Sequence, residues 1–295
     1  MTNSAPPPQL FFCTGLAKSG TTYLQALLNS HPQISCAEEQ DLWRLIELLR
    51  EMATRYNQRA VTLDLRTGGH GRPAFDAGAL RDLARSAMLA IVHGRAAGKP
   101  IAGAKDNRMF DRLDVCGAMF PEARFLCIVR NPLDRAVSAW HHNLRLAERE
   151  QDPRHSELML RHGGLEGWAR HLCGLHRTDM AAFLAASQTR ERRLLLRYED
   201  LVLDPLPQLR RTLAFLGAEA DEATLSAMLE RTSLAALRSS AAEPAFFRSG
   251  AISAGAGELP TSLRLALASD FAVDMAQLGY SITAEGLEVL PLELA

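Results

Sequence analysis

Short apolar runs alternate along this chain with longer segments whose apolar positions recur at helical spacing. The runs have the length and composition of buried strands, and we predict strands at residues 10–13, 34–36, 101–105, 124–130 and 193–198. Helical periodicity predicts a helix beginning near Gly20 and further helices over residues 42–56, 77–97 and 132–148. Strands that alternate with helices predict a three-layer α/β/α fold with a central parallel sheet covered on both faces.

The remaining segments predict the organisation around that sheet. Residues 1–9 contain three consecutive prolines and predict a loose tail, which leaves residues 10–295 as a single domain. Residues 57–76 are rich in Gly, Arg and polar side chains and predict an exposed excursion. Ligands of parallel sheets bind at the carboxyl ends of the strands. We expect residues 42–76 and 150–176, which show no sheet pattern, to overhang that edge and to contact a substrate bound there.

Composition is that of an ordinary globular protein and narrows the choice of partners. The 295 residues are 47% hydrophobic and 23% charged, and the net charge of -1 gives no sign of nucleic-acid binding. Five scattered cysteines without metal-ligand spacing predict reduced thiols. No signal segment and no apolar run of membrane-spanning length is visible in the sequence. We therefore expect a cytoplasmic protein, whose oligomeric state is unreadable from the residues.

The turn after the first strand, GLAKSGTT at residues 15–22, carries the strongest chemical signal. Such a turn directs backbone N–H groups into one concavity, and the positive N-terminal end of the next helix completes a phosphate site. Lys18, Thr21 and Thr22 add a charge and two hydroxyls. The glycine spacing is that of a Walker loop, but Thr21 stands where that loop has its lysine. An ordinary strand–helix turn with a solvated lysine would show the same pattern.

A second constellation follows the clearest strand. Arg130 leaves the end of that strand, and Ser138 lies on the helix that starts at Pro132. An arginine and a serine placed in this way can converge on one anion, the arginine through its forked donors. Arg130 alone would fit equally well as a capping or ion-pairing residue. The downstream sequence RYEDL makes a third element, and the three together favour a binding site.

Three segments, AKSGTTYL, RNPLDRAVSAW and LRYEDLVLDP, followed by FFRSG, resemble the sulfotransferase family that uses 3′-phosphoadenosine 5′-phosphosulfate (PAPS). The resemblance covers residues 10–280 and implies a P-loop-like sulfotransferase fold. The donor-binding residues that it implies are Lys18, Ser19, Gly20, Thr21 and Thr22 for the 5′-phosphosulfate, Arg130 and Ser138 for the 3′-phosphate, Tyr198 for the adenine, and Arg248 and Gly250 for a C-terminal lid. Ser249 stands where the family often has a lysine.

The resemblance also implies a mechanism, in which an acceptor oxygen attacks sulfur in line and adenosine 3′,5′-bisphosphate leaves without help from a metal. Lys18 is implied at the bridging oxygen and Lys105 at the sulfonyl group. Many members carry Lys-x-His here and use the histidine as base, but this chain has Asn107 in its place. Asp106 and Glu39 are then the candidate bases, with Glu38 next to the latter, and we favour Glu39 for its offset to the following helix.

The acidic residues Glu38, Glu39 and Asp41 would also suit the start of a helix without any catalytic role. With that alternative noted, we expect a PAPS-dependent sulfotransferase acting on a hydroxyl or amine of a small-molecule, carbohydrate or lipid acceptor. A P-loop kinase is the first alternative, and it requires magnesium and the Walker lysine that Thr21 replaces. A non-catalytic nucleotide-binding module, which would bind adenosine 3′,5′-bisphosphate without turnover, is the second. Nothing in the residues names the acceptor.

Overall fold

A sheet of five parallel strands organises the chain, which the computed structural model describes at residues 7–150, 157, 159–240, 252, 255–283 and 286–290. The strand order is β2-β3-β1-β4-β5, and each neighbouring pair is parallel. The strands are β1 (Gln9–Gly15), β2 (Ile34–Ala37), β3 (Ile101–Lys105), β4 (Arg124–Val129) and β5 (Arg193–Arg197). The predicted parallel sheet is confirmed, and β1 begins one residue inside the predicted tail, at Gln9.

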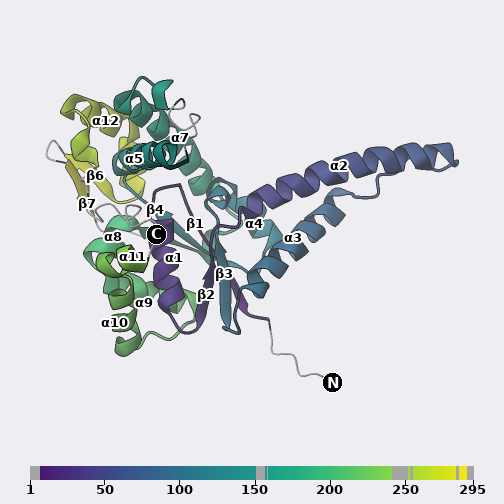
Figure 1. Cartoon of the computed structure of the whole chain (residues 1–295), viewed down its shortest axis with the longest axis horizontal. Coiled ribbons are helices and arrows are strands. Elements are labelled where there is room, and N and C mark those ends of the chain that lie inside the picture. The colour runs from purple at the N-terminus through teal and green to yellow at the C-terminus, as the bar shows by residue number, and fades with distance from the viewer. Residues whose placement is uncertain are drawn as a thin grey trace.

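Alternation of side chains along the strands divides the apolar core between the two faces of the sheet. In β1, Phe11 and Cys13 join the cluster built with helices α1 (Thr21–Ser30), α9 (Pro205–Leu216) and α10 (Glu222–Arg231). Leu10 and Phe12 join the opposite cluster, built with α3 (Ala77–Gly94), α5 (Pro132–Glu150), α7 (Leu165–Ala185) and α12 (Thr261–Gln277). Helices therefore cover both faces, and the predicted three-layer architecture is confirmed (Figure 1).

Helix α2 (Leu42–Arg66) runs with α3 as an arm that projects from the body of the molecule (Figure 1). The prediction that regular structure ends at Tyr56 was wrong, because the helix continues for ten further residues. Residues 57–66 contain no glycine or proline, so nothing local stops the helix before Gly68. The exposure of residues 57–76 was correctly expected, since Leu63 and Leu65 are exposed within them, and Leu48, Met52 and Tyr56 are exposed earlier in α2.

A small antiparallel sheet near the C-terminus was not predicted. It pairs β6 (Tyr280–Thr283) with β7 (Gly286–Val289), apart from the main sheet. Arg197, the last residue of β5, donates hydrogen bonds to the carbonyls of Leu278, Gly279 and Leu290 beside this pair. The short helical elements are α4 (Leu113–Met119), α8 (Tyr198–Leu203), α11 (Leu234–Ser240), η1 (Asn107–Arg112), η2 (Arg190–Arg192) and η4 (Ala256–Glu258).

All five cysteines are buried and free, in agreement with the thiols expected from their spacing. Burial raises the pKa of Cys13 to about 12, so that this thiol stays protonated and unreactive. Among the helices of the described ranges, none combines the length and the apolarity that crossing a membrane requires.

Candidate active site

The turn between β1 and α1 is built around two residues with left-handed backbone angles. Lys18 has φ 70° and Gly20 has φ 97°, and Ser19 N donates to Leu16 O over 3.0 Å. Position 20 admits only glycine, because a β-carbon there would lie 2.4 Å from the ring of Tyr198. Gly20 is also the N-cap of α1 and supplies no side-chain cap. The N-terminal end of α1 is therefore open to an anion.

Several buried polar atoms at this edge of the sheet lack a protein partner. The hydroxyls of Thr14 and Ser19, Nε of Arg130 and Nδ2 of Asn131 make no hydrogen bond with any described residue. Buried donors are rarely left unsatisfied in folded proteins. Their concentration beside the glycine turn fits a site that receives phosphate or sulfonyl oxygens.

The structure brings the two predicted anion-binding elements together. Arg130 Nη1 donates to the backbone carbonyl of Lys18 over 3.3 Å. Its guanidinium also lies over the ring of Tyr198, 4.4 Å from the ring centroid. Ser138 is half-buried on α5, the helix that follows Arg130. The turn after β1, the end of β4 and the start of α8 therefore meet at one edge of the sheet, the edge formed by the carboxyl ends of parallel strands.

Residues flanking Tyr198 hold this edge in place, and the sequence analysis missed that role. The buried carboxylate of Glu199 accepts hydrogen bonds from Asn131 N (3.0 Å) and from the Tyr280 hydroxyl (2.7 Å). Burial raises the pKa of Glu199. Arg197 makes a two-pronged ion pair with Asp200, at 2.7 Å and 2.9 Å. A run of charges directly after an apolar strand was the available signal.

Lys105 and Glu39 lie on the other side of the glycine turn. Lys105 is buried, and its Nζ lies 3.3 Å from Thr22 Oγ1 and 3.4 Å from Glu39 Oε2. Asn107 Nδ2 also donates to Glu39 Oε2 over 3.4 Å. A cation thus connects the anion-binding turn to an exposed carboxylate, whereas the neighbouring Glu38 is exposed without such a contact among the described residues.

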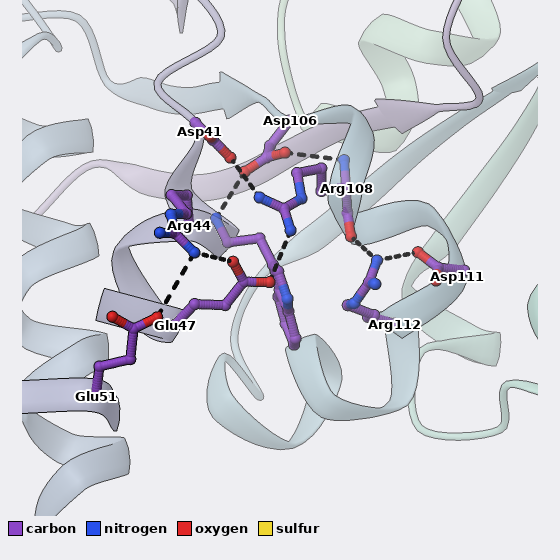
Figure 2. A network of polar contacts seen from close by, with 9 residues as sticks. Asp41, Arg44, Glu47, Glu51, Asp106, Arg108, Asp111 and Arg112 are labelled. Carbon is purple, nitrogen blue, oxygen red and sulfur yellow. Dashed lines mark hydrogen bonds and ion pairs between the residues drawn. The ribbon is translucent and has the colours of Figure 1, made fainter. Parts of the chain in front are cut away.

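Asp106, the other candidate base, is fully buried and acts as a staple between two elements. Its Oδ2 accepts from Trp43 N (3.1 Å) at the start of α2, and its Oδ1 accepts from Arg108 N (2.9 Å) in η1. Burial raises the pKa of this carboxyl. Figure 2 shows the surrounding network, in which Arg108 pairs with Asp41 and with Glu47. Both oxygens of Asp106 are therefore occupied by backbone donors.

The predicted lid residues, Arg248 and Gly250, lie outside the described residues. Beyond them, Gly255 packs against Asp134 of α5. Glu258 then accepts from His141 Nε2 at 2.6 Å, also on α5. No group of three or more His, Cys, Asp or Glu side chains in the described residues is arranged to hold a metal ion.

The fold and the edge just described define a class of α/β proteins that bind a phosphorylated group at the first strand–helix turn of a parallel sheet. A model of the sulfotransferase family matches residues 8–222. The chain therefore belongs to the sulfotransferase family.

Curated relatives are similar to this chain over part of its length. Protein-tyrosine sulfotransferase 1 from Homo sapiens is 32% identical over 128 residues, which cover 41% of this chain and 31% of the relative. The protein of the same name from Danio rerio is 25% identical over 222 residues, covering 73% and 55%. Nodulation protein NoeE from Sinorhizobium fredii is 30% identical over 138 residues, covering 45% and 32%. The matches thus span between 31% and 55% of these relatives' lengths.

Solved structures show the same fold. Mouse sulfotransferase SULT7A1, complexed with PAP, aligns with a TM-score of 0.55 and 17% identity over 92% of this chain and 86% of its own. Sulfotransferase STF9 from Mycobacterium avium aligns with a TM-score of 0.50 and 16% identity over 92% and 77%. These alignments confirm the P-loop-like sulfotransferase fold that the motifs implied.

Proposed function

We propose that this protein transfers a sulfonyl group from PAPS to a hydroxyl or amine of an acceptor. The observation that carries the proposal is the contact between Arg130 and the carbonyl of Lys18, 3.3 Å apart. It sets a forked cation beside the anion-binding turn, as a donor with phosphate groups at both its 3′ and 5′ positions requires. Membership of the sulfotransferase family supports the same assignment.

The donor fits the residues of this edge in two halves. The turn residues Lys18, Ser19, Gly20, Thr21 and Thr22 would hold the 5′-phosphosulfate through backbone N–H groups, two types of hydroxyl and one ammonium. The unpartnered Ser19 hydroxyl and Arg130 Nε are donors of the kind that such oxygens need. Arg130 and Ser138 would hold the 3′-phosphate, and Tyr198 would border the adenine. Arg248 and Gly250 stay predicted lid residues.

PAPS supplies an activated sulfonyl group whose leaving group is a phosphate oxygen. As the acceptor oxygen bonds to sulfur, the bond between sulfur and the phosphate oxygen breaks. The electron pair of that bond leaves on adenosine 3′,5′-bisphosphate. Lys18 would neutralise charge that grows on the leaving oxygen. Lys105, whose ammonium is already beside Thr22 Oγ1, would neutralise the sulfonyl oxygens. Preorganised cations of this kind lower the barrier because they do not have to reorganise during the reaction.

Glu39 is the residue that we propose as general base. Its carboxylate is partly exposed and lies 3.4 Å from Lys105 Nζ, so it borders the place of the sulfonyl group. Asp106 has both oxygens engaged by backbone N–H groups, which suits a structural role. We expect Glu39→Gln to lower kcat by about 100-fold or more without changing the melting temperature. Asp106→Asn should instead lower the stability, by about 1–3 kcal/mol, and near-normal turnover in Glu39→Gln would refute the assignment.

The chemical class of the acceptor is open, but its location follows from the proposed base. Helix α2 starts three residues after Glu39, so the base of the arm borders the place where an acceptor must lie. Two of the curated relatives are named as protein-tyrosine sulfotransferases, which makes a tyrosine-containing peptide the first acceptor to test. Small-molecule, carbohydrate and lipid alcohols complete the panel. The five buried, free thiols support a reducing compartment such as the cytoplasm.

Two measurements test the proposal. Calorimetric titration should show binding of adenosine 3′,5′-bisphosphate in preference to ATP with magnesium, and the reverse preference would favour a kinase. Incubation with sulfur-labelled PAPS and the acceptor panel should then label one acceptor class. Tight binding of the bisphosphate with neither transfer nor release of labelled sulfate would identify a non-catalytic binding module and refute the proposed activity.

A further inference from the structure

Two donors converge on a single oxygen of Glu39. Lys105 Nζ lies 3.4 Å from Oε2, and Asn107 Nδ2 donates to that same Oε2 over 3.4 Å. In the part of the chain that the structure describes, no hydrogen bond reaches Oε1. The Glu39 side chain is 40% exposed. The two carboxylate oxygens are therefore unequal, one held by the protein and the other open.

The backbone that carries Asn107 is fixed on two sides. Asp106 N donates to Cys13 O in β1 over 3.0 Å. The Asp106 carboxylate binds Trp43 N at the start of α2 and Arg108 N in η1, where Asn107 is the first residue. Since the segment with Glu39 leads directly into α2, the Asp106 carboxylate holds the start of α2 against the backbone that follows Asn107 (Figure 2).

The orientation of the Asn107 amide follows from charge. Turning the amide over would place Oδ1 against the ionised carboxylate of Glu39, which repels it, so Nδ2 faces Glu39. Oδ1 is then buried and makes no hydrogen bond with any described residue. A buried oxygen without a partner costs stability. The contribution of this side chain therefore lies in its donor, which reaches the carboxylate.

Resting on the proposed function, we propose that Asn107 is a positioning residue, which holds Glu39 through Oε2 so that Oε1 receives the proton of the acceptor. In this step the acceptor O–H proton moves to Oε1 while the new O–S bond forms. The bond from sulfur to the 5′-phosphate oxygen breaks, and the electron pair leaves on that oxygen. A misplacement of the base by about 1 Å can cost about 100-fold in rate.

The charged surroundings define what the loss of Asn107 should do. Lys105 shares Oε2 with Asn107, and Arg108 pairs with Asp41 next to the same segment. Without the Asn107 donor, only Lys105 holds Oε2, and Oε1 is less firmly directed at the acceptor. Loss of this positioning should lower kcat and leave KM and nucleotide binding almost unchanged, whereas a purely structural change would lower stability or binding.

The test compares Asn107→Ala and Asn107→Asp with the wild-type protein, using labelled PAPS and a tyrosine-containing peptide. Release of labelled sulfate to water is followed in the same samples, and binding of adenosine 3′,5′-bisphosphate is measured by calorimetry. Gln9→Ala is the matched control, because Gln9 Nε2 donates to the carbonyl of Leu216 over 2.7 Å at the amino end of β1. This control removes a side-chain amide hydrogen bond at the end of β1 opposite to the glycine turn and outside residues 42–76.

We expect both Asn107 variants to bind the bisphosphate as the wild type does, with kcat lowered by about tenfold or more and KM little changed. Asn107→Asp, which adds a like charge beside Glu39, should be slower than Asn107→Ala. A kcat within about twofold of the wild type, a loss that appears in KM instead of kcat, or an equal loss in Gln9→Ala would overturn the inference. Absence of both transfer and sulfate release by the wild type would instead overturn the proposed function.

Discussion

Replacing Arg130 by alanine tests the donor assignment at its most specific point. The guanidinium lies over the Tyr198 ring, makes one long hydrogen bond of 3.3 Å to the Lys18 carbonyl, and keeps Nε buried without a partner among the described residues. It therefore has donors left for a phosphate. If those donors bind the 3′-phosphate, their removal should weaken binding of adenosine 3′,5′-bisphosphate and leave adenosine 5′-monophosphate almost unaffected.

The magnitude follows from the kind of interaction. A hydrogen bond between charged groups contributes about 1.5–3 kcal/mol, which corresponds to a change of about 10- to 150-fold in Kd. The existing bond to the Lys18 carbonyl is long and therefore weak, so breaking it when the nucleotide binds would offset little of this gain. Calorimetry with the two nucleotides on wild-type protein and variant gives the difference directly.

The control is Arg190→Ala, which removes an exposed arginine of η2 that has no side-chain hydrogen bond within the described ranges. It should bind both nucleotides as the wild type does. Equal losses for the two nucleotides in Arg130→Ala would place the guanidinium away from the 3′-phosphate. A loss below about twofold for the bisphosphate would refute the assignment altogether.

Two further predictions concern stability. In urea unfolding, Gly20→Ala should lower the free energy of unfolding more than Gly68→Ala does. Both positions have positive φ, which costs alanine about 1–2 kcal/mol, but only at Gly20 does a β-carbon meet the Tyr198 ring. Equal losses in the two variants would contradict this contact. Burial, and then Arg135, hold the pKa of His176 well below its usual value. The stability that depends on this neutral imidazole is present above about pH 6.5 and is lost as the pH falls. The melting temperature of His176→Gln should therefore depend less on pH than that of the wild type, whereas His70→Gln, at an exposed position, should keep the wild-type dependence.

Local patterns were enough to predict the sheet and the meeting of the glycine turn with Arg130 at one of its edges. Apolar runs such as residues 124–130 predicted strands, which are four to seven residues long in the structure. The spacing of Gly15 and Gly20 predicted a phosphate-binding turn. What topology adds is that parallel strands bring their carboxyl ends to one edge. Residues as distant in sequence as Lys18 and Arg130 could therefore be expected to meet, and the structure places them in contact.

The arm and the functions of the charged pairs could not be predicted in the same way. Residues 57–66 are polar enough to suggest a loop, but the chain that returns from the tip of α2 packs against them. Asn57 makes two hydrogen bonds to the Phe75 backbone, and Asp64 accepts from Gly71 N. Asp106 was interpreted as a candidate base because a carboxylate at a strand end can serve either chemistry or capping. The choice depends on whether backbone N–H groups lie within reach of both oxygens, which is a fact of tertiary structure.

The segment RYEDL, residues 197–201, makes structural contacts besides the aromatic contact of Tyr198. Tyr198 faces the glycine turn and Arg130, while Arg197 on one side ties β5 to the carbonyls around β6 and β7. On the other side, the Glu199 carboxylate accepts hydrogen bonds from the backbone N–H of Asn131, which directly follows Arg130, and from the hydroxyl of Tyr280 in β6. The Glu199 carboxylate therefore connects β6 to the backbone next to Arg130. The edge at which Arg130 meets the glycine turn is held from the C-terminal sheet as well as from the strands that form it.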